Sequence, residues 1–273
     1  MKMKRSQLIK TLTNIAPLEL AGSWDNVGLL LDPCATDPEV KRVLLTIDLN
    51  ARVLDEAISQ DMDGIIAYHP ILFAGTKRLL WSDVSSRIIL EACQRSIWIY
   101  SPHTALDAAE DGMTDWLLST VGEMQSAHVI DPHPVISNAG AGRVGTLTTN
   151  TPLSTILRRL SEKLGLKNLR VSTALQKPVD EIEVNRVAVC PGAGGSVVAA
   201  AKGHDLVVTG EMSHHAVLAN QVRGITTILT EHSNCERGFL PEFAARISKQ
   251  HPTLHLACAS TDADPLNTWR ADA

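Results

Sequence analysis

The chain has 273 residues, of which 44% are hydrophobic and 20% are charged, and its formal net charge is −5. This length and composition are typical of a soluble globular protein with one large domain or two lobes. The net charge disfavours a broad electrostatic surface for nucleic acid or anionic membranes, and no apolar run approaches the ~20 residues that a membrane span requires.

Cysteine usage and the start of the chain bear on location. The five cysteines are odd in number, scattered and without a Cys-x-x-Cys pair, which is typical of a reducing compartment. The basic residues 1–5 are not followed by an apolar segment, so no secretory signal is expected. We therefore expect a cytoplasmic protein, with the nucleus as an additional location, and no association with membranes.

In chain order, the first part of the sequence alternates helical and strand patterns. Apolar residues recur at helical spacing in some segments, and short apolar or β-branched runs mark strands between them. The predicted helices cover 6–15, 50–58 with Asn50 as the cap, 83–93 and 113–118, and the predicted strands lie within 23–31 and at 42–48, 63–70 and 97–100.

The composition changes in the middle of the chain. Prolines, glycines and histidines occur there without periodicity, which predicts a linker over 126–141 between an N-terminal lobe, 1–125, and a C-terminal lobe, 142–273. The second lobe is predicted to hold strands at 142–148, 169–173, 186–190, 205–210, 226–230 and 254–257, and helices at 153–164, 196–201, 211–222 and 239–247.

The two halves share one order of elements. Residues 43–107 and 187–236 each run strand, helix, strand, helix, strand. Such alternation predicts parallel sheets with crossover helices. The expected fold class is therefore α/β, with two related lobes whose mainly parallel sheets face each other across one metal-binding cleft.

The expectation of a metal comes from histidines that follow predicted strands. These are His69, His103 and His232, and Asp107 and Glu236 each lie four residues beyond one of them. Open α/β sheets carry their sites at the carboxyl ends of strands, so the side chains are expected to converge. Imidazole with carboxylate suits zinc, manganese or iron, and such a cation can activate water. The alternative for each histidine alone is an ordinary hydrogen-bonded side chain.

A second polar group opens the predicted helix at 211–222. Glu211, His214 and His215 suit roles as groups behind the ligands or as proton carriers, with a plain polar helix start as the alternative. The glycine-rich turn at 192–196 lacks the spacing of a phosphate-binding loop and is interpreted as a tight connection. Cys235 is interpreted as a neutral thiol, and the five tryptophans as packing residues.

Several stretches of the sequence resemble a known family. They are Ser23-Trp-Asp-Asn-Val-Gly-Leu-Leu30, Tyr68-His-Pro-Ile-Leu-Phe73, Ser101-Pro-His-Thr-Ala-Leu-Asp-Ala-Ala109, Thr209-Gly-Glu-Met-Ser-His-His215 and Glu231-His-Ser-Asn-Cys-Glu-Arg-Gly-Phe239. In these stretches the chain resembles the Ngg-one-interacting factor 3-like family, also called GTP cyclohydrolase 1 type 2 homologues. The forms of the motifs are similar to those of the eukaryotic branch of the family. The chain as a whole resembles a short version of these proteins.

The resemblance implies a dinuclear metal site between two α/β lobes, in subunits assembled as a toroidal hexamer. Carried over by motif, the ligands would be His69, Asp107, His232 and Glu236, with one or two divalent ions per subunit. One departure concerns the second ion, because many bacterial members have two histidines before the proline and this chain has Tyr68 in the first position. A phenol, with a pKa near ~10, is a poorer ligand at neutral pH.

The expected function is that of a metal-dependent hydrolase acting on a nucleotide or another phosphorylated small molecule. GTP cyclohydrolase activity is implied by the resemblance alone. In this hypothesis His103, His214 or His215 would carry protons. The alternative is a non-catalytic, metal-stabilised scaffold or regulatory protein with partners in transcription, as the family name suggests, and the net charge gives no support to nucleic-acid binding.

Overall fold

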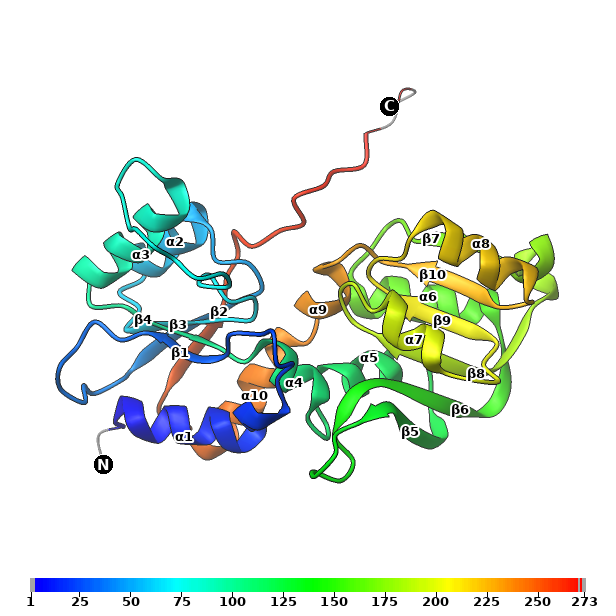
Figure 1. Cartoon of the computed structure of the whole chain (residues 1–273), viewed down its shortest axis with the longest axis horizontal. Helices are drawn as coiled ribbons and strands as arrows, with labels where there is room; N and C mark the ends of the chain where they lie inside the picture. The colour runs from blue at the N-terminus through cyan, green and yellow to red at the C-terminus, as the bar shows by residue number, and fades with distance from the viewer. Residues whose placement is uncertain (1–2, 270, 272–273) are drawn as a thin grey trace.

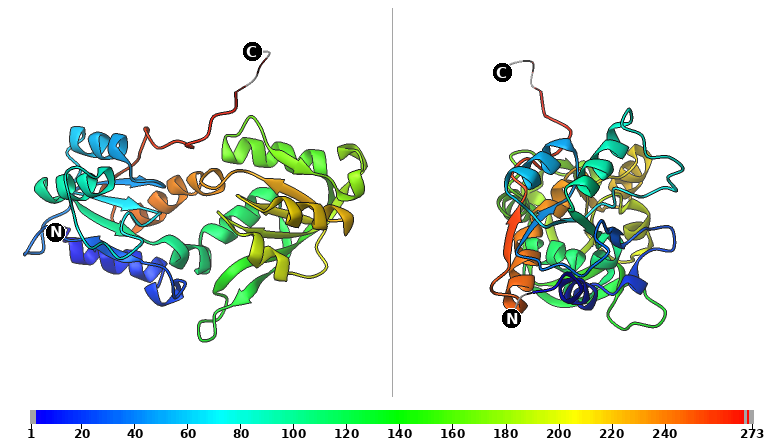
Figure 2. Two further views of the ribbon diagram at one scale, coloured as in Figure 1. Left: turned by 45° about the horizontal axis from the view of Figure 1, so that its top comes forward. Right: turned by 90° about the vertical axis from the view of Figure 1, so that its left-hand side faces the viewer.

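The computed structural model describes residues 3–269 and 271, so the first two residues of the basic start lie outside it. It contains a five-stranded and a six-stranded sheet, which lie towards opposite ends of the molecule with helices between them (Figures 1 and 2). Within the described residues, no helix has the length and apolarity that a membrane crossing requires.

The first sheet is covered by helices on both faces. Across the sheet the strands are β1 (Gly28–Leu31), β4 (Trp98–Ser101), β3 (Gly64–Ala67), β2 (Arg42–Thr46) and β11 (His255–Cys258). All neighbours run parallel except β1, which is antiparallel to β4. Helices α2 (Ala51–Ser59) and α3 (Val84–Gln94) pack on one face, and α1 (Arg5–Ile15) and α10 (Leu240–Gln250) pack on the other. Because both faces are covered, the middle of β2, residues 43–45, and the whole of β3 are apolar and buried.

The second sheet repeats this plan with antiparallel strands added at its edges. Its strands are β5 (Met124–Pro132), β6 (Gly140–Pro152), β8 (Glu183–Cys190), β9 (Leu206–Thr209), β10 (Thr226–Leu229) and β7 (Arg170–Ser172). Strands β8, β9 and β10 are parallel. Helices α5 (Met113–Val121) and α6 (Leu153–Leu164) cover one face, and α7 (Gly195–Ala200) and α8 (His214–Val222) lie over the other (Figure 1).

The predicted α/β class with two lobes and mainly parallel sheets is confirmed. The order β2-α2-β3-α3-β4 in the first sheet recurs as β8-α7-β9-α8-β10 in the second. Local signals account for the helix starts, since the Asn50 side chain accepts a hydrogen bond from the Val53 amide and Asp83 accepts one from the Ser86 amide. The remaining helical segments are η1 (Leu18–Leu20), η2 (Ala174–Gln176), η3 (Val179–Glu181), α4 (His103–Ala108) and α9 (Asn234–Arg237).

The structure differs from the sequence interpretation in the middle and at the end of the chain. Residues 126–141, which were expected to form a linker, contain most of β5 and the start of β6. Antiparallel pairing of these two strands orders a stretch that has no periodicity of its own. Residues 240–258 fell within the expected second lobe, yet α10 packs on the first sheet and β11 pairs with β2. The apolar stripe Leu240, Phe243 and Ile247 is buried there, against the N-terminal helix.

Beyond β11, the chain is tied to both halves by buried acidic groups. The carboxylate of Glu56 accepts hydrogen bonds from the amides of Ser260 and Thr261, both at 2.9 Å, and from their hydroxyls. Asp262 accepts from the Ile47 amide at 2.7 Å and from the Arg237 guanidinium at 3.2 Å. This segment therefore connects α2, the end of β2 and α9.

The carboxylate of Glu56 makes a pH-dependent contribution to stability. Burial alone would raise its pKa, but the hydrogen bonds from Ser260 and Thr261 outweigh burial and lower the pKa from 4.5 to about 2. The stabilisation is therefore present above the unfolded-state pKa and is lost as the pH falls towards the folded-state value. We expect Glu56→Gln to lower the free energy of unfolding by about 2 kcal/mol near neutral pH. Urea unfolding across the acid range should show this deficit shrinking as the pH falls.

The matched control is Glu162→Gln, a carboxylate on the exposed face of α6. It should leave the free energy of unfolding unchanged at every pH. A Glu56→Gln deficit of constant size from neutral to acid pH would contradict the account.

Candidate metal centre

Three parallel strands deliver histidines at their carboxyl ends. His69 follows β3, and its amide and that of Tyr68 donate to the carbonyls of Ile47 and Thr46 at 3.0 and 2.8 Å, which continues the pairing with β2. His103 begins α4 just after β4, and His232 follows β10. The position of each histidine backbone is therefore fixed by the strand that precedes it.

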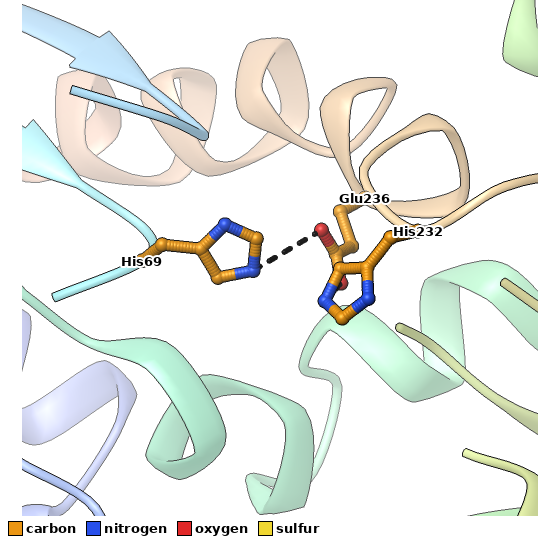
Figure 3. Close-up of side chains that lie close together, drawn as sticks. All are labelled: His69, His232 and Glu236. Atoms are coloured by element: carbon orange, nitrogen blue, oxygen red, sulfur yellow. Dashed lines mark ion pairs between the residues drawn. The ribbon is translucent and has the colours of Figure 1, made fainter. Parts of the chain in front are cut away.

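His69, His232 and Glu236 form one compact group. Nε2 of His69 lies 3.5 Å from Oε2 of Glu236, and Nε2 of His232 lies 3.8 Å from Oε1 of the same carboxylate. The candidate ligand atoms all lie within 4.8 Å of one another. Figure 3 shows His69 approaching from one side, while Glu236 and His232 approach from the other. The group therefore brings together the end of β3 in the first sheet and the segment that follows β10 of the second sheet.

In each of the three histidines that follow strands, Nδ1 is hydrogen-bonded to a carboxylate. An imidazole that donates from Nδ1 to a carboxylate keeps its lone pair on Nε2, which is how metal-binding histidines are commonly oriented. The pairs are His69 with Asp48 at 2.8 Å, His103 with Asp25 at 2.7 Å and His232 with Glu211 at 3.1 Å.

The group contains polar atoms whose hydrogen-bonding capacity is unused. Among the described residues, Nε2 of His69 and Oε2 of Glu236 are buried without a hydrogen-bond partner. Burial, followed by the neighbouring charges of Asp107 and Asp48, raises the pKa of Glu236 well above its usual value. Buried polar atoms are normally satisfied, and a buried carboxylate needs a positive charge. Two imidazoles and a carboxylate therefore fit a divalent cation such as zinc, manganese or iron.

The glycine-rich turn after β8 brings backbone against this group. Gly192 has φ of +58°, and a Cβ placed on it would lie 2.9 Å from Oε1 of Glu236 and 3.0 Å from Nε2 of His232. Its amide donates to the Cys235 sulfur at 3.3 Å. Burial raises the pKa of the Cys235 thiol, in agreement with the neutral thiol expected from the sequence. The turn thus makes the space in which the ligand atoms face each other.

Asp107 lies outside this group and is engaged by Tyr68. The phenol donates to Oδ1 of Asp107 at 2.6 Å, and Tyr68 is only 2% exposed. Burial raises the pKa of Asp107 from 3.8 to about 6, although the hydrogen bond from Tyr68 acts in the opposite direction. One oxygen of the expected fourth ligand is therefore occupied by the residue that departs from the bacterial pattern.

The other predicted histidines have different surroundings. The ring centroid of His103 lies 5.4 Å from that of His69, and its backbone has φ of +28°, an uncommon conformation outside glycine. His214 and His215 are exposed at the start of α8, where their rings lie 5.4 Å from each other. The helix predicted at 211–222 begins at His214, with Ser213 as its cap, so Glu211 lies before it. Of the three proposed proton carriers, only His103 contacts a member of the metal group in the described structure.

The sequence interpretation missed Asp48 and Asp25 as partners of the histidines. Asp48 had a usable signal, because it lies two residues beyond the end of β2 and β2 neighbours β3 in a parallel sheet. Asp25 lies in the stretch 23–30 that resembles the family, but no spacing links it to a histidine, because only the antiparallel pairing of Gly28 with Ser101 brings its loop beside His103. Glu211 was expected behind the ligands, and its bond to His232 agrees with that role.

Comparison with known proteins gives a consistent family. The family model Duf34/NIF3 (NGG1p interacting factor 3) matches residues 3–265. The protein NIF3 homolog of Schizosaccharomyces pombe is 39% identical over 274 residues, which cover 96% of this chain and 97% of that protein. NIF3-like protein 1 of Drosophila melanogaster is 34% identical, with 98% and 90% covered. The crystal structure of a Bacillus cereus protein related to NIF3 has a TM-score of 0.82 at 20% identity, covers 98% of this chain and 100% of that one, and shares the fold.

Gly192 offers a direct test of the metal group. A methyl group at this position would crowd both Glu236 and His232, so we expect Gly192→Ala to weaken zinc binding by about 10- to 100-fold. Gly165→Ala is the matched control, because Gly165 has φ of +68° but nothing within 4 Å of a new Cβ. It should share the backbone strain and keep the affinity. Titration of the metal-free proteins against a competing chelator measures both, and equal affinity in wild type and Gly192→Ala would contradict the assignment.

Proposed function

The chain belongs to the Duf34/NIF3 family, and from this premise we propose that it is a metal-dependent hydrolase. The proposed substrate is a nucleotide or another phosphorylated small molecule. The observation that supports a cation most strongly is that two facing ligand atoms, Nε2 of His69 and Oε2 of Glu236, are buried without a hydrogen-bond partner, while carboxylates lie behind the histidines.

In this proposal His69, His232 and Glu236 hold the cation. A divalent cation bound there supplies Lewis-acid chemistry, which activates water for attack and offsets developing negative charge. Asp48 and Glu211 keep the imidazoles of His69 and His232 oriented, with Nδ1 donating and Nε2 free. Gly192 keeps the approach to these atoms open.

His103 is the favoured proton carrier. Asp25 accepts from its Nδ1, so Nε2 is free to take a proton, and the Asp25 side chain is itself fully buried. Desolvation would raise the pKa of Asp25, but the hydrogen bonds from His103 and Thr104 lower it below its usual value, which keeps the carboxylate ionised. His214 and His215 remain proposed proton carriers for a substrate that extends towards α8.

The hydrolase proposal is tested by turnover in variants of the group. Metal-loaded wild type should release phosphate, or formate from GTP, on a panel of nucleotides and sugar phosphates. We expect Glu236→Gln and His69→Ala to lower this rate by about 100-fold or more, because each removes a ligand. His255→Ala, an exposed histidine on β11, should have no effect. A fully metal-loaded protein without turnover on the whole panel would remove the hydrolase and leave the second candidate.

That second candidate is a metal-stabilised scaffold or regulatory protein. It is favoured by one observation, which is that the ligands come from the ends of two different sheets. A cation in that position would fasten the lobes to each other. A large fall in melting temperature on chelation, with no turnover, would support it. The hexamer, the transcription-related partners and the cytoplasmic or nuclear location stay predictions.

The number of cations is tested at Tyr68. Because its phenol occupies Oδ1 of Asp107, we propose one firmly held cation and a weak second position. Tyr68→His would restore the bacterial pattern and is expected to raise zinc content from about one to about two equivalents per chain. Tyr68→Phe, which frees Asp107 without adding a ligand, should stay near one. Equal metal content in all three proteins, each folded by circular dichroism, would contradict this explanation of the second site.

A further inference from the structure

Two exposed aromatic rings flank His103. Trp24 is 64% exposed and Phe73 is 52% exposed, and their ring centroids lie 6.0 Å apart with an angle of 65° between the planes. The ring of His103 is 6.1 Å from Trp24 and 6.3 Å from Phe73. The sequence interpretation took the tryptophans as packing residues, which holds for Trp98 at 1% exposure but not for Trp24.

One side of the Trp24 indole rests on backbone. A Cβ placed on Gly22 would lie 2.9 Å from Cε2 and Nε1 of the indole, so the ring packs closely against this residue. Much of the rest of the indole is exposed. A ring that is supported on one side and open elsewhere presents a flat surface at little cost in conformational entropy.

The loop that carries Trp24 is fixed on both sides. The buried carboxylate of Asp25 accepts from Nδ1 of His103 at 2.7 Å and from the Thr104 amide at 3.2 Å. On the other side, the Asn26 side chain donates to the Leu72 carbonyl, next to Phe73. These bonds hold Trp24, Phe73 and His103 in one arrangement before any ligand arrives.

The side chain of His103 lies between this aromatic pair and the candidate metal group. His103 contacts His69 with 5.4 Å between centroids, and Nε2 of His69 is 3.5 Å from Glu236. A ligand that touched both regions would need a flat, apolar part at one end and a polar or anionic part at the other. Aromatic side chains stack well on planar heterocycles, and an edge-to-face pair gives such a ring one face and one edge to contact.

We propose that Trp24 and Phe73 bind the planar aromatic ring of the substrate, a nucleobase or a similar heterocycle, while its phosphorylated part lies toward His103 and the metal group. This proposal rests on the proposed function and narrows its substrate class to ring-bearing phosphates. The recognition comes from stacking, which every nucleobase permits, so the pair selects for a ring and not for one base.

The test compares two probes, guanosine 5′-monophosphate and ribose 5-phosphate, by calorimetric titration of the zinc-loaded protein. We expect the nucleotide to bind about tenfold more tightly, and Trp24→Ala to remove that advantage. Trp24→Phe should retain most of it. Gly22→Ala keeps every aromatic side chain but displaces the indole, and it should weaken the nucleotide and not the sugar phosphate. Trp269→Ala, which removes a tryptophan that is 84% exposed near the end of the chain, should change neither affinity.

Equal affinities for the two probes, or an unchanged advantage in Trp24→Ala, would overturn the proposal. If wild type shows no ring preference and Trp24→Ala changes the oligomeric mass measured by sedimentation, the surface would instead be assigned to contact with a second copy of the chain. That result would also overturn the proposal. The proposed function fails separately. Turnover of phosphorylated compounds without a ring preference would support the hydrolase proposal and contradict the stacking proposal. A ring preference without turnover would support the stacking proposal and contradict the hydrolase proposal.

Discussion

The carboxylate of Glu236 is 1% exposed and lies between two imidazoles, with Asp48 and Asp107 close enough to raise its pKa further. Keeping such a group charged away from water is costly unless a positive charge compensates it. Arg237 gives part of that compensation, but its guanidinium is bonded to Asp262 and Ser233. A divalent cation between Glu236, His69 and His232 would supply the rest, and it would also satisfy Nε2 of His69 and Oε2 of Glu236, which are buried without a hydrogen-bond partner.

The position of Glu236 depends on the way in which the two halves of the fold are connected. His69 belongs to the first sheet, whereas His232 and Glu236 follow the last parallel strand of the second. Helix α10 then returns the chain to the first sheet, and Asp262 bonds both Arg237 of α9 and the Ile47 amide at the end of β2. The geometry of the metal group therefore depends directly on the relative placement of the two lobes. This coupling suits a hydrolase that needs fixed ligands and equally a scaffold that needs fixed lobes.

Much of this arrangement could be predicted from the sequence, because its signals are local or periodic. Alternating helix and strand patterns indicated parallel sheets, and parallel sheets bring His69, His103 and His232 to strand ends of the same kind. The rest depends on contacts between distant segments. Strand β5 is ordered by its pairing with β6, and Asp25 reaches His103 only through the pairing of β1 with β4. The position of Trp24 beside His103 likewise depends on hydrogen bonds from its loop to His103 and Leu72, which no spacing in the sequence indicates.

The most direct test of the account is the metal content per chain, measured by mass spectrometry on gently purified wild type and on His232→Ala. The account predicts about one equivalent or more of zinc, manganese or iron in wild type, and loss of that metal in His232→Ala, because the variant lacks one of the ligands. Wild type that holds no metal, even after reloading with each of these ions, would contradict it. So would a His232→Ala protein that retains the wild-type content.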